Sequence, residues 1–348
     1  MTDHSCPTGI ALSLTVTCIP EDDDALQLKA QALAEKLHLR GASCGAQLQE
    51  APSPCSPQYR LVYTVKGLEL QTLGPETGRF TTTLTTDFVH GNTGYRRLHG
   101  GGIHQPLARA TGLKAGVRPT IVDATAGLGI DAFILASLGC KVTMIERSPV
   151  IGALLADGLQ RAASHPATKD IMSRLQLFIG NSHEIIASLP EQPATIYLDP
   201  MYPHRHTAAL NKQEMRTIRS LVGDDQDAAA LLETALTIAS NRVVVKRPKG
   251  APELSARRPS HIIEMKNSRF DVYLTNRLTR AKSPQPNNPY NMSHSFCIMK
   301  NIDKFQTIQK GAAHKETYRK VFRSGQEYNQ RVRSYCLQRV YPSLDVSW

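Results

Sequence analysis

The sequence predicts an α/β protein with a mostly parallel sheet, a small N-terminal α/β domain and a basic C-terminal extension. Between about residues 91 and 279, apolar runs of strand length alternate with segments of helix length. A glycine turn follows the first of these runs, and residues 280–348 carry no comparable periodicity. Such alternation favours a parallel sheet with helices on both faces. We therefore divide the chain into residues 1–90, 91–279 and 280–348.

The composition indicates a globular protein with a polyanionic partner. The chain has 348 residues, 41% of them hydrophobic, and a formal net charge of +11. Most of the excess lies between Arg280 and Trp348, where there are twelve Lys or Arg against four Asp or Glu. A basic excess favours binding to polyanions, although a solvated tail has the same composition.

Targeting and cysteine patterns favour a cytoplasmic protein with reduced thiols. No run approaches the ~18 apolar residues of a membrane span. Asp3 and Pro7 stand where a signal peptide has basic residues, so we expect a first strand at the N-terminus instead. The seven cysteines are scattered and form no C-x-x-C pair, which argues against a disulfide framework and against a zinc site.

In the N-terminal domain we expect one helix among short apolar strands. The helix spans about Asp23 to Leu37, and the acidic residues 22–24 favour its N-terminus. The apolar runs are ALSLTVTCI, YRLVYTV and LELQTL. No residue of this domain is assigned a chemical role.

In the middle domain the expected elements alternate from strand to helix. The strands are expected at 120–125, 141–146, 175–180, 195–200, 242–248 and 270–275. The helices are expected at about 129–138, 149–163, 182–188, 209–221 and 226–239. In such a sheet, ligands bind outside the carboxyl ends of the strands, near a topological switch point.

The stretch VDATAGLGIDAF follows the first of these strands and opens a helix. Gly127 and Gly129 allow the backbone to approach a ligand, and the helix N-terminus offers free N–H groups. Glu146 ends the next strand, 19 residues after Gly127, where its carboxylate can accept hydrogen bonds from two ribose hydroxyls. These features predict a nucleoside-containing cofactor, with NAD(P) and S-adenosylmethionine both open.

The stretch IYLDPMYPHR indicates the chemistry. Asp199 ends the fourth strand and therefore faces the same edge as Gly127 and Glu146. The Asp-Pro-x-Tyr arrangement resembles the motif of class I methyltransferases that methylate exocyclic amines of bases. We expect the Asp199 carboxylate and the Pro200 carbonyl to accept the amine N–H groups, and Tyr202 to stack on a flipped base. This chemistry requires no metal ion.

Longer stretches resemble, in order, the RsmJ family of small-subunit (16S) ribosomal RNA (guanine-N2)-methyltransferases. They include TDFVHGNTGYRRLHGGG, VDATAGLGIDAF, YLDPMYPH and RVVVKRP, and the similarity covers roughly Thr86 to Leu274. The resemblance implies a class I, Rossmann-like methyltransferase fold and S-adenosyl-L-methionine as cofactor. It also implies small-subunit ribosomal RNA, or the 30S subunit, as the partner.

The resemblance further implies cofactor contacts, carried over position by position and added to the two glycines. The resulting set is Gly127, Gly129, Ile130, Asp131, Glu146, Arg147, Asn181, Ser182 and Asp199. Two positions depart from the family pattern: Ile130 replaces an arginine, and Asn181 replaces a small hydroxyl residue. A backbone contact at Ile130 survives this change, whereas a side-chain contact does not.

Several assignments remain open. Arg96 and Arg97 either close over cofactor or RNA phosphate, or belong to a flexible turn before a helix. Lys246 and Arg247 end the fifth strand and either touch the RNA backbone or are surface cations. The methylated group is alternatively another nucleic-acid base amine or a protein amide. A non-catalytic RNA-binding assembly factor with the same fold is the remaining alternative. The extension at 280–348 is either an RNA-gripping element, a tail or a protein-docking helix.

Overall fold

The computed structural model describes most of the first 275 residues. The described ranges are 13–37, 58–74, 77–201, 213–223 and 225–275. Two predictions lie outside them: the stacking role of Tyr202 and the role of the extension at 280–348. The domain boundaries at about 90 and 279 stay predictions.

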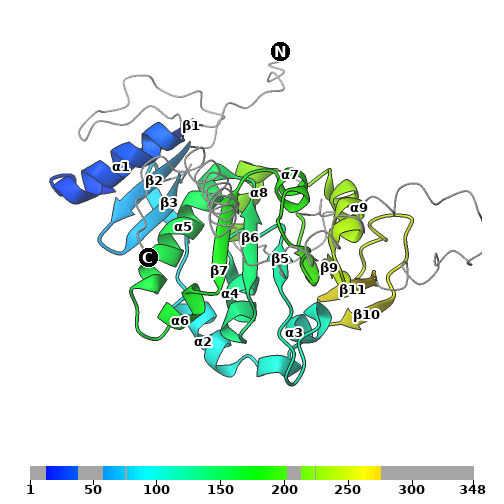
Figure 1. The fold of residues 1–348 in the computed structure, drawn as a ribbon. Coiled ribbons are helices and arrows are strands. Elements are labelled where there is room, and N and C mark those ends of the chain that lie inside the picture. The colour runs from blue at the N-terminus through cyan, green and yellow to red at the C-terminus, as the bar shows by residue number, and fades with distance from the viewer. Residues whose placement is uncertain (1–12, 38–57, 75–76, 202–212, 224, 276–348) are drawn as a thin grey trace, which may run out of the picture. The chain divides into compact units, whose positions relative to one another are not determined.

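The N-terminal part is a four-stranded sheet with one helix (Figure 1). Its elements are β1 Ser13–Ile19, α1 Asp24–Lys36, β2 Gln58–Thr64, β3 Gly67–Leu73 and β4 Phe80–Thr85. The strand order is β1-β2-β3-β4, with β1 and β2 parallel and the other pairs antiparallel. The expected helix is confirmed, and it begins there because Asp23 accepts hydrogen bonds from the backbone N–H groups of Ala25 and Leu26.

The second sheet has seven strands and is mostly parallel, which confirms the predicted fold class. Its strands are β5 Ile121–Asp123, β6 Val142–Glu146, β7 Leu175–Ile179, β8 Thr195–Leu198, β9 Arg242–Pro248, β10 His261–Glu264 and β11 Ser268–Leu274. Their order is β10-β11-β9-β8-β5-β6-β7. Strands β5 to β9 pair in parallel, whereas β11 runs antiparallel to both β9 and β10.

Helices cover both faces of this sheet (Figure 1). They are α2 Gly91–His99, η1 Gly102–His104, α3 Pro106–Thr111, α4 Ile130–Ser137, α5 Pro149–Ala163, α6 Lys169–Met172, α7 Ser182–Ala187, α8 Gln213–Val222 and α9 Ala228–Ile238. Adjacent strand residues point to opposite faces. Ile121 and Tyr197 therefore pack with α3, α4, α5 and α6, while Val122 and Ile196 pack with α7 and α9.

Helix α5 joins the two sheets, because it packs against both. Leu155 belongs to the core of the seven-stranded sheet, whereas Ile151 and Leu154 pack with residues of β2 and β3. A polar contact reinforces this packing, since the Asp157 carboxylate accepts a hydrogen bond from the backbone N–H of Leu68 at 3.0 Å. The four-stranded sheet is thus fixed beside the helix that follows β6.

Candidate functional site

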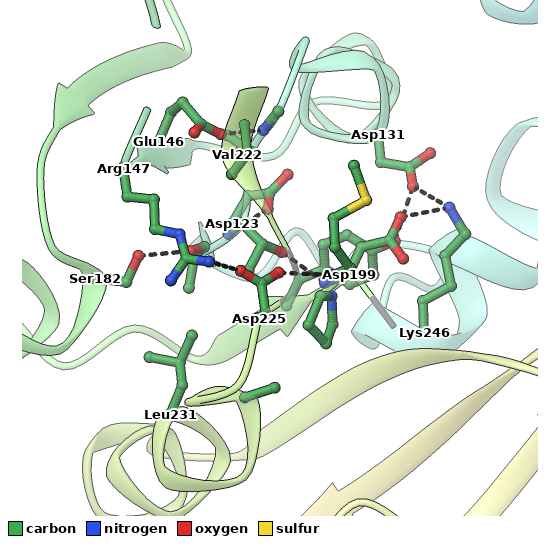
Figure 2. A pocket seen from close by; sticks show the side chains of 18 of the residues that line it. Asp123, Asp131, Glu146, Arg147, Ser182, Asp199, Val222, Asp225, Leu231 and Lys246 are labelled. Carbon is green, nitrogen blue, oxygen red and sulfur yellow. Dashed lines mark hydrogen bonds and ion pairs between the residues drawn. The ribbon is translucent and has the colours of Figure 1, made fainter. Parts of the chain in front are cut away.

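The carboxyl ends of β5, β6 and β8 meet at the topological switch point of the seven-stranded sheet. Strand β5 lies between β6 and β8, so the segments that follow these strands leave the same edge in different directions. A cavity of about 840 Å³ opens there (Figure 2). Gly127, Glu146 and Asp199 all line it, which confirms that these residues share one edge.

The glycine turn needs its glycines for two different reasons. Both Gly127 and Gly129 have left-handed backbones, with φ of +54° and +73°. A Cβ on Gly129 would lie 2.6 Å from a methyl of Leu155, so this glycine also permits close helix packing. A Cβ on Gly127 would meet nothing within 4 Å. Gly127 is therefore the member of the pair that leaves space on the cavity side.

Glu146 is held in place by the turn that it faces. Its Oε2 accepts the backbone N–H of Gly127 at 2.8 Å, and its Oε1 accepts the N–H of Ser148 at 2.7 Å. Burial raises the pKa of Glu146, and these two hydrogen bonds oppose the rise. Each carboxylate oxygen retains further acceptor capacity. The residue is therefore suited to two ribose hydroxyls, as its position in the sequence predicts.

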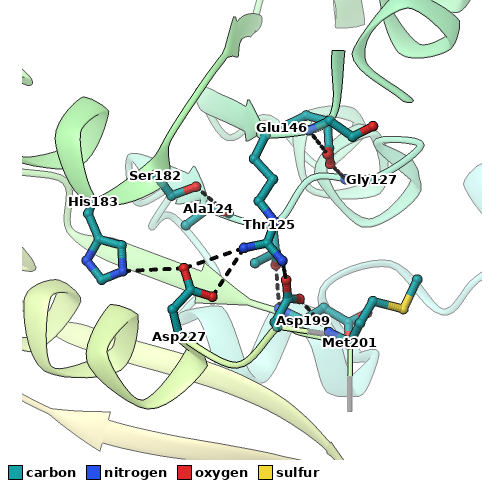
Figure 3. A network of polar contacts seen from close by, with 12 residues as sticks. Ala124, Thr125, Gly127, Glu146, Ser182, His183, Asp199, Met201 and Asp227 are labelled. Carbon is teal, nitrogen blue, oxygen red and sulfur yellow. Dashed lines mark hydrogen bonds and ion pairs between the residues drawn. The ribbon is translucent and has the colours of Figure 1, made fainter. Parts of the chain in front are cut away.

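Arg147 points toward the loop between α8 and α9. Its guanidinium pairs with Asp225 and with Asp227, the latter at 3.2 Å (Figures 2 and 3). Asp225 in turn accepts the backbone N–H of Met201 at 2.6 Å and donates its own N–H to the Met201 carbonyl at 3.1 Å. Arg147 lines the cavity, and its side chain pairs with the carboxylate that holds Met201.

The Asp199 backbone is fixed from the other side by the glycine turn. Its N–H donates to Thr125 Oγ1 at 2.6 Å (Figure 3). The carboxylate accepts from Lys246 Nζ at 2.7 Å. Burial raises the pKa of Asp199, and the Lys246 ammonium opposes the rise. Pro200 follows with fixed φ, so the backbone is held before and after it by Thr125 and Asp225.

Asp131 lies at the centre of a charged network. Its Oδ1 accepts from Arg96 at 2.7 Å, and its Oδ2 accepts from the Tyr197 hydroxyl at 2.8 Å and from Lys246 at 3.3 Å. Burial would raise the pKa of Asp131, but Lys246 and Arg96 outweigh it and lower the pKa. Arg96 belongs to α2, a helix that the sequence did not predict. Ile130 begins α4 and lines the cavity with a side chain that is 40% exposed.

Asn181 and Ser182 shape the cavity wall at the start of α7. Asn181 caps the helix, because its side-chain oxygen accepts the N–H of His183 at 2.9 Å. The Ser182 hydroxyl donates to the carbonyl of Ala124 at 2.6 Å and ties α7 to the end of β5. Both residues line the cavity. The predicted cofactor residues therefore all line it except Gly129, which packs against Leu155 instead.

Sequence reasoning missed Asp123, and of its two alternatives for Arg247 the surface cation is wrong. Asp123 ends β5, is buried, and lines the cavity. Burial, with help from the nearby Asp131 carboxylate, raises its pKa well above the ordinary range. Lys246 pairs with site carboxylates, and Arg247 is 2% exposed and donates to the Pro252 carbonyl, so this side chain is not a surface cation. The sequence did contain a signal for Asp123, because an aspartate ends the strand in the VDAT stretch.

The residues present fit S-adenosylmethionine. Glu146 offers acceptors for ribose hydroxyls, Gly127 leaves open space, and Asn181 and Ser182 line the wall beside them. In the described part of the chain, no group of three or more His, Cys, Asp or Glu side chains is placed to hold a metal ion. Nor does any helix there have the length and apolar character to cross a membrane.

Comparisons with known proteins agree with this geometry. The SAM_MT family of SAM-dependent methyltransferases matches residues 46–275. A ribosomal RNA small subunit methyltransferase J from Desulfotalea psychrophila is 46% identical over 76% of this chain and 99% of its own length. One of the same name from Aeromonas salmonicida is 54% identical over 63% of this chain and 87% of its own. The crystal structure of a SAM-dependent methyltransferase from Neisseria gonorrhoeae is 32% identical, with a TM-score of 0.56 over 80% of this chain and 100% of that one.

Proposed function

The chain belongs to the ribosomal RNA small subunit methyltransferase J family of SAM-dependent methyltransferases, and on this premise we propose that it methylates the N2 amine of a guanosine in small-subunit ribosomal RNA. One observation carries the proposal. Asp199 stands at the cavity edge beside Gly127 and Glu146, with its backbone fixed by Thr125.

The cofactor half of the cavity is the turn after β5 and the end of β6. We infer that Glu146 holds the ribose hydroxyls, while Gly127, Ile130 and the start of α7 surround the rest of the nucleoside. When bound, S-adenosylmethionine supplies an electrophilic methyl group on a sulfonium sulfur. In this interpretation Arg147 acts indirectly, through Asp225, and Asp131 acts by orienting Lys246.

The substrate half of the cavity is the Asp-Pro segment. A base amine is a weak nucleophile, because its lone pair is delocalised into the ring. The Asp199 carboxylate and the Pro200 carbonyl would accept the two amine N–H groups and aim the lone pair at the methyl group. The proton released after transfer goes to water. Tyr202 remains the proposed stacking partner of the base.

The choice of small-subunit RNA is supported by the relatives, which are ribosomal RNA small subunit methyltransferases by name, and by the net charge of +11. In the same proposal the protein works in the cytoplasm. Binding of RNA phosphates is one of the three alternatives for the basic segment at 280–348. Cys140 is a buried free thiol, in keeping with a cytoplasmic protein.

Nucleoside analysis tests the proposal. Small-subunit RNA from a strain that lacks the gene should lose N2-methylguanosine, measured by mass spectrometry of the digested RNA. The wild-type gene should restore it, and a gene carrying Asp199→Ala should not. Loss of a different methylated nucleoside would transfer the activity to another amine. An unchanged nucleoside profile would refute RNA methylation by this protein.

A further inference from the structure

Lys246 is a cation placed among the carboxylates of the cavity. It lies on β9, next to β8, so its side chain reaches the edge where Asp199 stands (Figure 2). The ammonium donates to Asp199 at 2.7 Å and to Asp131 at 3.3 Å. The side chain is 33% exposed and lines the cavity. A ligand in the cavity can therefore reach Lys246 and Asp199 together.

The ammonium has donor capacity left for such a ligand. It carries three N–H groups, of which Asp199 and Asp131 take two. No described residue accepts a hydrogen bond from the third. Burial would lower the pKa of Lys246, but the Asp199 and Asp131 carboxylates outweigh it and raise the pKa, so the group stays charged at neutral pH. The cavity thus presents an acceptor and a charged donor side by side.

This pair complements one edge of guanine. On that edge the N2 amine and the N1–H are donors, and the adjacent O6 is an acceptor. A carboxylate can accept from the amine side while a neighbouring ammonium donates to O6. Adenine offers no oxo group beside its amine, and its N1 is an acceptor that would face the carboxylate. The order of acceptor and donor therefore favours guanine over adenine.

We propose that Lys246 selects guanine by donating its remaining N–H to O6 of the base whose amine Asp199 accepts. This inference rests on the proposed function and deepens it by naming the residue that reads the base. It differs from a contact between Lys246 and the RNA backbone, which is one of the two alternatives that the sequence leaves open. A backbone contact would be indifferent to the base, whereas this contact depends on one atom of it.

A single-atom change in the base tests the proposal. The probe is a synthetic RNA with the mapped target guanosine, compared with the same RNA carrying 6-thioguanosine, which keeps N1–H and the amine. Sulfur is a weak acceptor. Wild-type kcat/KM should fall roughly ten- to a hundredfold on the thio-RNA, the effect of one charge-assisted hydrogen bond. Lys246→Met should be slower on both RNAs. Its kcat/KM on the guanosine RNA divided by its kcat/KM on the thio-RNA should be near one.

Two further variants separate this role from a structural one. Lys246→Gln keeps a neutral donor. Its ratio of kcat/KM on the two RNAs should lie between that of the wild type and that of Lys246→Met. Lys249→Met removes an exposed lysine just beyond β9, which pairs with Glu264 at 3.2 Å, and should keep the wild-type ratio. A Lys246→Met ratio equal to that of the wild type would assign the discrimination to the size of sulfur and overturn the inference. Equal wild-type rates on the two RNAs would also overturn it. Failure of the wild type to methylate guanosine RNA would refute the proposed function and this inference with it.

Discussion

Replacing Glu146 by alanine should weaken cofactor binding strongly. In the proposed complex the carboxylate accepts two ribose hydroxyls, and hydrogen bonds to a charged group contribute about 1.5–3 kcal/mol each. Their loss corresponds to about 3–6 kcal/mol, or roughly a 10²- to 10⁴-fold rise in Kd. The substitution also leaves the N–H groups of Gly127 and Ser148 without their carboxylate acceptor, so the glycine turn should loosen.

Calorimetric titration with S-adenosylmethionine measures this effect without any RNA. Glu264→Ala is the matched control, because that glutamate lies on the edge strand β10 with a side chain 66% exposed. Glu146→Gln keeps one acceptor oxygen and should fall between wild type and Glu146→Ala. Since burial raises the pKa of Glu146, wild-type affinity should fall as the pH falls, and the Gln variant should lose this dependence. Unchanged affinity of Glu146→Ala would remove the residue from the ribose site.

Three further outcomes follow from the geometry. Gly129→Ala should destabilise the protein by about 2–5 kcal/mol through strain plus overpacking, and Gly127→Ala by only about 1–2 kcal/mol through strain, as measured by urea unfolding. Asp123→Asn should stabilise the apo protein, and more so as pH rises above the ordinary aspartate pKa. The reason is that the raised folded-state pKa contributes stability at low pH that is lost as the carboxyl ionises. Asp225→Ala should lower kcat roughly tenfold or more by freeing Met201, which follows Pro200, with a smaller effect on cofactor Kd.

Each of these predictions has an outcome that contradicts it. Equal losses of unfolding free energy in the two glycine variants would mean that packing at Gly129 is unimportant. A thermal shift of Asp123→Asn that does not vary with pH would mean that Asp123 has an ordinary pKa. For Asp225, Asp227→Ala is the control. Asp227 also pairs with Arg147, but the N–H of Met201 donates to the carboxylate of Asp225. Equal kcat losses in the two variants would refute a specific hold of Asp225 on Met201.

The parallel core of the sheet could be predicted from sequence because its strands are buried on both faces and therefore nearly continuous apolar runs. The run at 242–248 is confirmed residue for residue as β9, and the helix at 149–163 as α5. The edge strand β10 was missed. Three of its four residues are exposed, and apolar and polar residues do not alternate along it. Helix α2 was missed because it contains two glycines and no side chain caps its N-terminus.

The site could be predicted where an acidic residue ends a strand at the ligand edge, as Glu146 and Asp199 do. It could not be predicted where two side chains that contact each other lie far apart in the sequence. Lys246 lies 47 residues from Asp199 in sequence, and only the parallel pairing of β8 with β9 brings them into contact. The contact between Asp225 and Met201 likewise depends on how the loop before α9 returns to the cavity.

Single-turnover methyl transfer by Asp199→Ala at saturating S-adenosylmethionine and RNA tests the role of Asp199 most directly. We expect a rate at least roughly a hundredfold below wild type, because the amine loses its charged acceptor. Cofactor affinity, measured on the same preparation, should stay close to that of the wild type. A near-wild-type rate with intact cofactor binding would contradict the assignment of Asp199 as the residue that grips the amine.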